Sequence, residues 1–256
     1  MNNSPIDIDK LIEGTNEILT ANRNSLQLFD MLHSMRQFDD LTYVHSVNVA
    51  LIASILGQWL KFSEKDIRIL TISGLLHDIG KIMIPNEILT KPGKLTVAEY
   101  NIMKQHVNFG YEKVKNQNID IRIKEACLLH HEKCDGTGYP FGLKSDQIPA
   151  VAKIIAIADV YDAMTSARVY RGALCPFEVI DTMYKDAFTK FEPEYILPFL
   201  KNVASSYINN DVRLSDGRIG KVVLINENAL SLPIVQCEDE FIDLSKTRGL
   251  TVSAIL

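Results

Sequence analysis

The sequence predicts a mainly α-helical bundle followed by a small β module. Apolar residues recur every three or four positions from about residue 7 to residue 207, which is the period of an amphipathic helix. After Asn210 the pattern changes to short apolar runs separated by turn residues, which is typical of strands. The chain has 256 residues and 46% of them are hydrophobic, enough for one substantial helical core and a small appended module.

The helical region divides into an extension and a bundle. Residues 1–38 are predicted to form a helical extension, because their loosely periodic apolar positions favour one more bundle helix over a dimerising coil. Residues 39–207 are predicted to form the main helical domain, and residues 208–256 the β module. The first helix of the main domain is expected to begin near Asp39 or Asp40, either of which can cap it.

Local signals place the next elements. A helix is expected to begin after Ser63, with Asp66 in a box-like arrangement, and to continue until Gly80 stops it. A capping box at Thr96 and Glu99 predicts a helix that carries both Met103 and His106. Further helices are predicted at about residues 123–131, 149–166, 177–188 and 193–206, with a Gly- and Pro-rich loop at residues 135–143. Strands are predicted at about residues 212–214, 219–225, 233–237, 241–244 and 250–256.

Charge and composition exclude several classes of function. The formal net charge is -5, from 27 Lys and Arg against 32 Asp and Glu with no long run of like charge, so polymeric nucleic acid is not an expected partner. The sequence has no apolar run near the ~20 residues of a membrane-spanning helix and no signal-peptide pattern, which predicts a cytoplasmic protein without membrane contact. The 4 cysteines show no Cys-x-x-Cys spacing and are expected to be reduced.

Histidines occur in unusual places. The chain holds 6 of them, and two pairs of adjacent polar residues, His77 with Asp78 and His130 with His131, end apolar helical patterns. Consecutive helical residues point about 100° apart, so such a pair cannot bury both side chains in one apolar stripe, but it can hold a metal beside the helix end. A single histidine such as His33 or His45 is more often structural, and the spacing alone leaves both interpretations open.

The residue types favour two-metal chemistry if a metal is bound. Imidazole with carboxylate suits Fe, Mn, Zn or Co better than Ca or Mg. An aspartate beside a ligand histidine can offer one oxygen to each of two ions, and two-metal sites stabilise both the attacking and the leaving oxygen of a phosphoryl group.

Three runs and one single histidine together resemble the HD-GYP subgroup of the HD phosphohydrolase superfamily, over about Val44 to Leu200. These are HDIGKIMIPNEILTKPGKLTVAEY from His77, then His106, then HHEKCDGTGYPFGL from His130, and IADVYDAMTSARVYR from Ile157. The resemblance implies an HD-type helical bundle and a metal-dependent phosphodiesterase. In this family a metal-bridging hydroxide opens cyclic di-GMP to pGpG, and some members continue to GMP.

The resemblance also implies a ligand set. Its pattern assigns one metal to His45, His77, Asp78 and Asp159, with Asp78 bridging to a second metal that is held by His106, His130 and His131. Fe or Mn is the expected metal. Members with three metals carry a Glu one helical turn before the first histidine, and here that position is Leu41, so two divalent ions are expected.

The remaining site residues have alternative interpretations. The resemblance implies that Lys81 reaches the substrate phosphate and assists the leaving oxygen, and that Arg168 and Arg171 bind nucleotide phosphates. Asp162 is expected to support a ligand or to contact substrate. Taken alone, Lys and Arg near a helix end usually lie in water and favour the helix dipole.

The Gly138, Tyr139 and Pro140 triplet could simply be a rigid loop. In the family it is associated with partner contacts, notably with diguanylate cyclase (GGDEF) domains. Two other functions stay open at this point. The pocket could be a non-catalytic cyclic di-GMP receptor that acts through protein partners, or the chain could be an HD hydrolase that acts on a nucleotide monoester.

Overall fold

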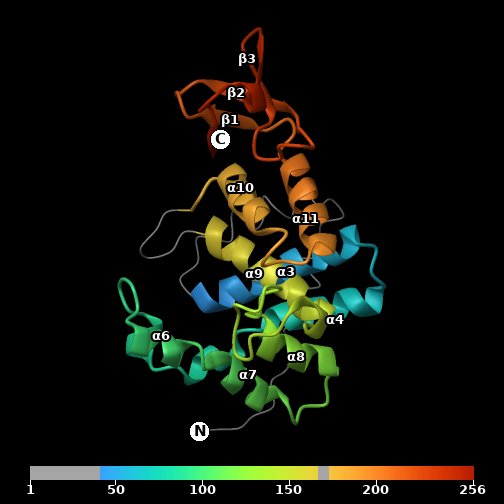
Figure 1. Cartoon of the computed structure of the whole chain (residues 1–256), viewed down its shortest axis with the longest axis vertical. Helices are drawn as coiled ribbons and strands as arrows, with labels where there is room; N and C mark the ends of the chain where they lie inside the picture. Colours follow the sequence, from blue (N-terminus) through green and yellow to red (C-terminus); the bar gives the residue numbers. More distant parts are fainter. Residues whose placement is uncertain (1–40, 167–172) are drawn as a thin grey trace. The chain divides into compact units, whose positions relative to one another are not determined.

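The computed structural model describes residues 41–166 and 173–256, which form two compact units (Figure 1). One unit comprises the described residues up to Asp162, and the other those from Ala163 to Leu256. Helices dominate the first unit, and the second combines helices with an antiparallel sheet of 5 strands. The predicted fold class is therefore confirmed. The predicted domain limits at residues 38 and 207 stay a prediction.

Helices α3 (Leu41–Trp59) and α4 (Glu64–Leu76) pack against each other at the centre of the first unit. A Cβ atom added to Gly74 would lie 2.4 Å from the Ala50 Cα, so only glycine allows this close approach. The hydroxyl of Ser63 accepts a hydrogen bond from the Asp66 amide, which confirms the predicted helix start. The predicted caps of α3, Asp39 and Asp40, lie outside the described residues.

The predicted end of α4 at Gly80 is wrong. The helix ends at Leu76, and residues 79–83 form a separate 3-10 helix, η1 (Ile79–Met83). Gly80 lies inside η1, where a Cβ atom would stand 1.9 Å from the carbonyl oxygen of His106. The requirement for glycine here therefore comes from packing of η1 against α7 (His106–Val114), and not from a helix stop.

The predicted helix through Met103 and His106 is two helices. The short helix α5 (Asn86–Leu89), which the sequence did not predict, precedes α6 (Val97–Met103), and α6 begins with the predicted capping box of Thr96 and Glu99. Helix α6 ends at Met103, and His106 opens α7. The Met103 carbonyl accepts a hydrogen bond from the His106 ring at 2.7 Å, whereas in a continuous helix it would accept one from a backbone amide.

Two more helices complete the first unit. Helix α8 (Ile121–Leu129) packs against α4 and α7, and helix α9 (Ala150–Thr165) follows a loop that contains the short helix η2 (Ser145–Gln147). The predicted Gly- and Pro-rich loop at residues 135–143 contains no helix, as expected, and η2 begins after it. Buried apolar side chains of α3, α4, α8 and α9 form the core.

The second unit contains α10 (Pro176–Asp186) and α11 (Pro193–Ser206), and α10 packs against α11 and the last strand. The strands pair antiparallel in the order β4-β3-β2-β1-β5. Their bounds are β1 (Asp211–Leu214), β2 (Ile219–Leu224), β3 (Ile234–Cys237), β4 (Glu240–Asp243) and β5 (Val252–Ile255), with η3 (Leu244–Lys246) after β4. The change of period after Asn210 thus predicted the sheet correctly.

Two further expectations concern the described residues. None of the helices within residues 41–166 and 173–256 is both long enough and apolar enough to cross a membrane. The cysteines Cys127, Cys134, Cys175 and Cys237 form no disulfide with one another in the described part of the chain.

The contact between η1 and α7 predicts a difference between two glycine substitutions. Gly80→Ala places a methyl group 2.4 Å from the Gly110 amide and is expected to lower the free energy of unfolding by about 1–3 kcal/mol. Gly110 lies on the α7 side of the same contact, and the methyl group of Gly110→Ala would stand 3.4 Å from the Gly80 amide. Alanine also has a higher helix propensity than glycine, so the free energy of unfolding is expected to change by less than about 1 kcal/mol. Urea denaturation of both metal-free variants measures the difference, and equal stabilities would contradict it.

Candidate metal centre

Five histidines and two aspartates from five helices and their ends converge in the first unit. His77 and Asp78 directly follow α4, and His130 and His131 directly follow α8. His106 opens α7, His45 lies on α3 and Asp159 lies on α9. All the metal ligands predicted from the sequence are therefore brought to one place. They form two groups whose potential ligand atoms lie within 4.8 Å of one another: Asp78, His106, His130 and His131, and His45, His77 and Asp159.

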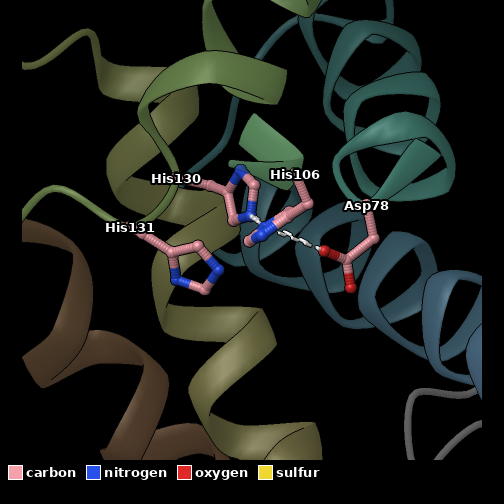
Figure 2. Close-up of side chains that lie close together, drawn as sticks. All are labelled: Asp78, His106, His130 and His131. Carbon is pink, nitrogen blue, oxygen red and sulfur yellow. Dashed lines mark hydrogen bonds and ion pairs between the residues drawn. The ribbon is translucent and has the colours of Figure 1, made fainter. Parts of the chain in front are cut away.

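The carboxylate of Asp78 stands between the two groups. Its Oδ2 atom lies 3.3 Å from His77 Nε2 and 3.5 Å from His45 Nε2. Its Oδ1 atom lies 3.3 Å from His106 Nε2 and 3.9 Å from His130 Nε2. Figure 2 shows His106 and His130 on the side of Oδ1, with His131 beyond them. Each oxygen of Asp78 thus faces a different set of imidazoles.

Three imidazoles are oriented by the backbone of their own helices. The Nδ1 atoms of His77, His106 and His130 donate to the carbonyls of Gly74, Met103 and Ala126, at 2.7, 2.7 and 2.9 Å. Because a carbonyl can only accept a hydrogen bond, each Nδ1 must hold the proton, and each Nε2 presents a lone pair to the centre. This is the arrangement in which histidine binds a metal.

His45 is held by carboxylates of α9. Its Nδ1 atom lies 2.7 Å from Asp162 Oδ2, and its Nε2 atom lies 3.1 Å from Asp159 Oδ1. Asn48, one turn after His45, donates to the other oxygen of Asp162 at 2.8 Å. Asp162 is therefore buried behind His45, which favours a supporting role for it over contact with substrate.

The protonation of the imidazoles differs between the groups. Burial lowers the pKa of His106 and His130 and, in the same way, lowers that of His131 to about 4, so these three rings are neutral near pH 7. Burial also favours the neutral form of His45, but hydrogen bonds to Asp159 and Asp162 outweigh it and raise the pKa of His45 to about 9.

The two carboxylates stay ionised although they are buried. Burial would raise the pKa of Asp78, but the nearby charge of Lys81 outweighs it and helps to hold this pKa well below its ordinary range. In the same way, hydrogen bonding and the charge of His45 lower the pKa of Asp159 against the effect of burial. The centre thus offers anionic oxygens together with the neutral nitrogens of His106, His130 and His131.

The donor atoms fit divalent metal ions. The Nε2 atoms of His106 and His130 lie 3.4 Å apart, and with both protons on Nδ1 their lone pairs face each other, which is favourable only around a cation. His77 Nε2 and Asp78 Oδ1 are buried and have no hydrogen-bond partner among the described residues. Buried polar atoms are normally paired, so these positions are the ones that a metal would satisfy.

The difference in protonation between His45 and the rings of His106, His130 and His131 predicts that the two groups bind metal with different pH dependence. A metal at the His45 group must displace the His45 proton, so its apparent affinity should rise about tenfold per pH unit from pH 6 to 8. The group with His106, His130 and His131 needs no such displacement in this range, so its affinity should be nearly constant. Calorimetric titration of metal-free protein with Mn²⁺ at pH 6, 7 and 8 measures both, and two ions with the same pH dependence would contradict the expectation.

Lys81 lies beside the centre, where its ammonium group forms an ion pair with Asp78 Oδ2. The Tyr139 ring stacks on the His131 ring, with centroids 4.7 Å apart, so the Gly138, Tyr139 and Pro140 triplet also borders the centre. Arg168 and Arg171, which were predicted to bind nucleotide phosphates, lie outside the described residues.

Sequence reasoning missed two residues. Asn48 supports Asp162, and its position one helical turn after a predicted ligand histidine was the available signal. Glu132 directly follows the His130 and His131 pair and is only 4% exposed. An acidic residue beside two ligands and before a glycine-rich loop was a signal for a buried role.

Comparison with known proteins places the chain in a family. Residues 13–195 match the HD domain family. A cyclic di-GMP phosphodiesterase of Pseudomonas aeruginosa is 37% identical over 79% of this chain and 49% of its own length. The cyclic di-GMP phosphodiesterase response regulator RpfG of Xanthomonas campestris is 36% identical over 76% of this chain and 52% of its own length. The chain thus spans about half the length of these curated relatives.

Other matches differ in their named substrate or share only the fold. A 3'3'-cGAMP-specific phosphodiesterase of Vibrio cholerae is 36% identical over 66% of this chain and 38% of its own length. The solved structure of an HDG"Y"P protein from Bdellovibrio bacteriovorus aligns with a TM-score of 0.59 and 21% identity, over 75% of this chain and 60% of that one. With the family match over residues 13–195 and this shared fold, the chain belongs to the HD domain family, as its sequence predicted.

Proposed function

We propose that the chain is a metal-dependent phosphodiesterase that hydrolyses cyclic di-GMP to pGpG. The observation that carries this proposal is the position of Asp78, whose two carboxylate oxygens face two separate sets of imidazoles. Such a carboxylate can bridge two ions, and paired ions suit the hydrolysis of a phosphodiester.

The proposed ligands follow the two groups of side chains. His45, His77 and Asp159 would hold one ion, His106, His130 and His131 the other, and Asp78 would bridge them. Fe and Mn are the proposed metals, because mixed imidazole and carboxylate ligands suit both. When bound, the ions supply positive charge for the phosphate and lower the pKa of water to near neutrality.

The protein's own residues orient the proposed ligands and bind the phosphate. Asp162 and Asn48 hold His45 in position, and backbone carbonyls hold His77, His106 and His130. Lys81 is proposed to contact the phosphate and to assist the leaving oxygen, because its ammonium group lies beside Asp78 with a side chain that is 23% exposed. Arg168 and Arg171 are proposed to bind nucleotide phosphates.

The choice of cyclic di-GMP follows the names of the Pseudomonas aeruginosa and Xanthomonas campestris relatives, which match 79% and 76% of this chain. Because other relatives are named for 3'3'-cGAMP, the proposal is tested with both dinucleotides. Cyclic di-GMP is expected to be cleaved faster, to pGpG first and then to GMP. The Gly138, Tyr139 and Pro140 triplet is proposed to contact diguanylate cyclase domains.

The experiment uses full-length protein that is purified anaerobically and loaded with Fe²⁺ or Mn²⁺. Cyclic di-GMP, 3'3'-cGAMP, pGpG and a nucleotide monoester are each incubated with it, and the products are separated by chromatography. Turnover of cyclic di-GMP above that of the other three supports the proposal. Tight binding without product would identify a receptor instead, and selective cleavage of the monoester would identify a different HD hydrolase.

A further inference from the structure

Glu132 binds the backbone of the loop that carries Tyr139. Its carboxylate accepts hydrogen bonds from the backbone amides of Phe141 at 2.7 Å, Gly142 at 3.2 Å and Leu143 at 2.9 Å. The side chain is buried, and three charge-assisted hydrogen bonds use both of its oxygens. Glu132 is therefore occupied by the loop and does not serve as a metal ligand itself.

The same loop is fixed to the backbone of the adjacent ligand pair. The Tyr139 amide donates to the His131 carbonyl at 3.2 Å. A Cβ atom on Gly138 would lie 2.5 Å from the Glu132 Cα and 2.6 Å from the His131 carbonyl oxygen, so the loop backbone rests directly on these residues. This docking places the Tyr139 ring on the His131 ring, with an interplanar angle of 28°.

His131 needs such a support more than the other histidines of its group. His106 and His130 each donate from Nδ1 to a backbone carbonyl, which fixes both rings. Among the residues that the structure describes, no backbone carbonyl accepts a hydrogen bond from His131, and its side chain is 27% exposed. Its Nδ1 atom lies 3.8 Å from the Asp159 carboxylate, and the His106 and His130 rings lie at its edge or tilted to it, so the Tyr139 ring is the one that stacks on its face.

We infer that Glu132 is a positioning residue, which anchors the loop so that Tyr139 holds the His131 ring in the orientation that binds metal. The inference rests on the metal centre of the proposed function, but not on its substrate. A partner that displaces the Tyr139 loop would thereby weaken one ion of the pair. The loop would thus connect partner binding to the metal centre through Glu132.

The test compares three variants of the full chain with wild type. Glu132→Ala removes the carboxylate that accepts hydrogen bonds from the loop amides. Gly138→Ala adds a methyl group that pushes the loop backbone away from Glu132 and His131. Tyr139→Leu removes the ring that stacks on His131 but leaves the hydrogen bonds to Glu132 in place. Glu112→Gln is the matched control, because the Glu112 side chain is 60% exposed and pairs only with Lys115 among the described residues. Hydrogen exchange of the amides of residues 141–143 is measured in metal-free protein, and Mn²⁺ affinity is measured by calorimetry.

The expected results distinguish the role of Glu132, which holds the loop, from that of Tyr139, which stacks on His131. Glu132→Ala and Gly138→Ala should speed amide exchange at residues 141–143 and weaken one Mn²⁺ about 10- to 100-fold, the usual effect of losing support for a ligand. Tyr139→Leu should weaken the same ion while the amides stay protected. Glu112→Gln should change neither.

Unchanged affinity for both ions in Glu132→Ala and Tyr139→Leu would overturn the inference, as would equal loss of both ions. If Glu132→Ala does not fold, Tyr139→Leu alone decides between these results. Since neither readout uses a nucleotide, a failure of the proposed phosphodiesterase activity would leave this result standing, and the reverse also holds.

Discussion

Asp78→Asn is expected to prevent the two groups from holding a pair of ions and to remove hydrolysis of cyclic di-GMP. An amide has nearly the shape of the carboxylate but lacks its charge, and its nitrogen cannot bridge an ion. One of the two oxygens that face the histidine sets is thereby lost. The loss of activity should exceed the roughly 10²- to 10³-fold effect of removing a single electrostatic donor.

Metal content by elemental analysis and turnover by chromatography measure this effect. Asp239→Asn serves as control, because Asp239 is exposed in a turn of the second unit. Circular dichroism of the metal-free variant confirms that the fold is kept. A folded Asp78→Asn protein that retains both ions would refute the bridging role of Asp78.

Lys81→Met is expected to lower kcat about 10²- to 10³-fold while both metals stay bound, because a cation near the phosphate is lost and the metal ligands stay in place. Methionine keeps most of the length and the apolar stem of lysine. In the metal-free protein the ammonium group of Lys81 neutralises Asp78, so its removal should leave the carboxylate free for metal.

Steady-state kinetics with cyclic di-GMP and elemental analysis of the same sample separate these effects. Lys115→Met provides the control, since Lys115 pairs with Glu112 on the surface of the first unit. If Lys81→Met loses metal in proportion to activity, Lys81 serves to assemble the centre. An unchanged kcat would show that Lys81 has no role in the reaction.

Local sequence signals predicted the elements that local contacts determine. Ser63 and Thr96 each cap a helix through an amide three residues later, and both helix starts were predicted. The end of α4 and the break before α7 were not predicted. The end of α4 depends on a contact between segments, the packing of Gly80 against the His106 backbone, whereas the break before α7 depends on a hydrogen bond from the His106 ring to the Met103 carbonyl.

The candidate metal centre was largely predictable because four of its seven side chains occur as adjacent pairs at helix ends. His77 with Asp78 and His130 with His131 retain that arrangement in the structure. The supporting residues were not predictable in the same way. Glu132 has partners that lie 9 to 11 residues away in the sequence, and only the folded loop brings their amides to its carboxylate.

Anomalous X-ray diffraction from crystals of protein loaded with Mn²⁺ tests the two-ion centre most directly. The account predicts two peaks, one on each side of the Asp78 carboxylate, with His45, His77 and Asp159 around one and His106, His130 and His131 around the other. A single peak, or two peaks that do not share Asp78, would contradict it.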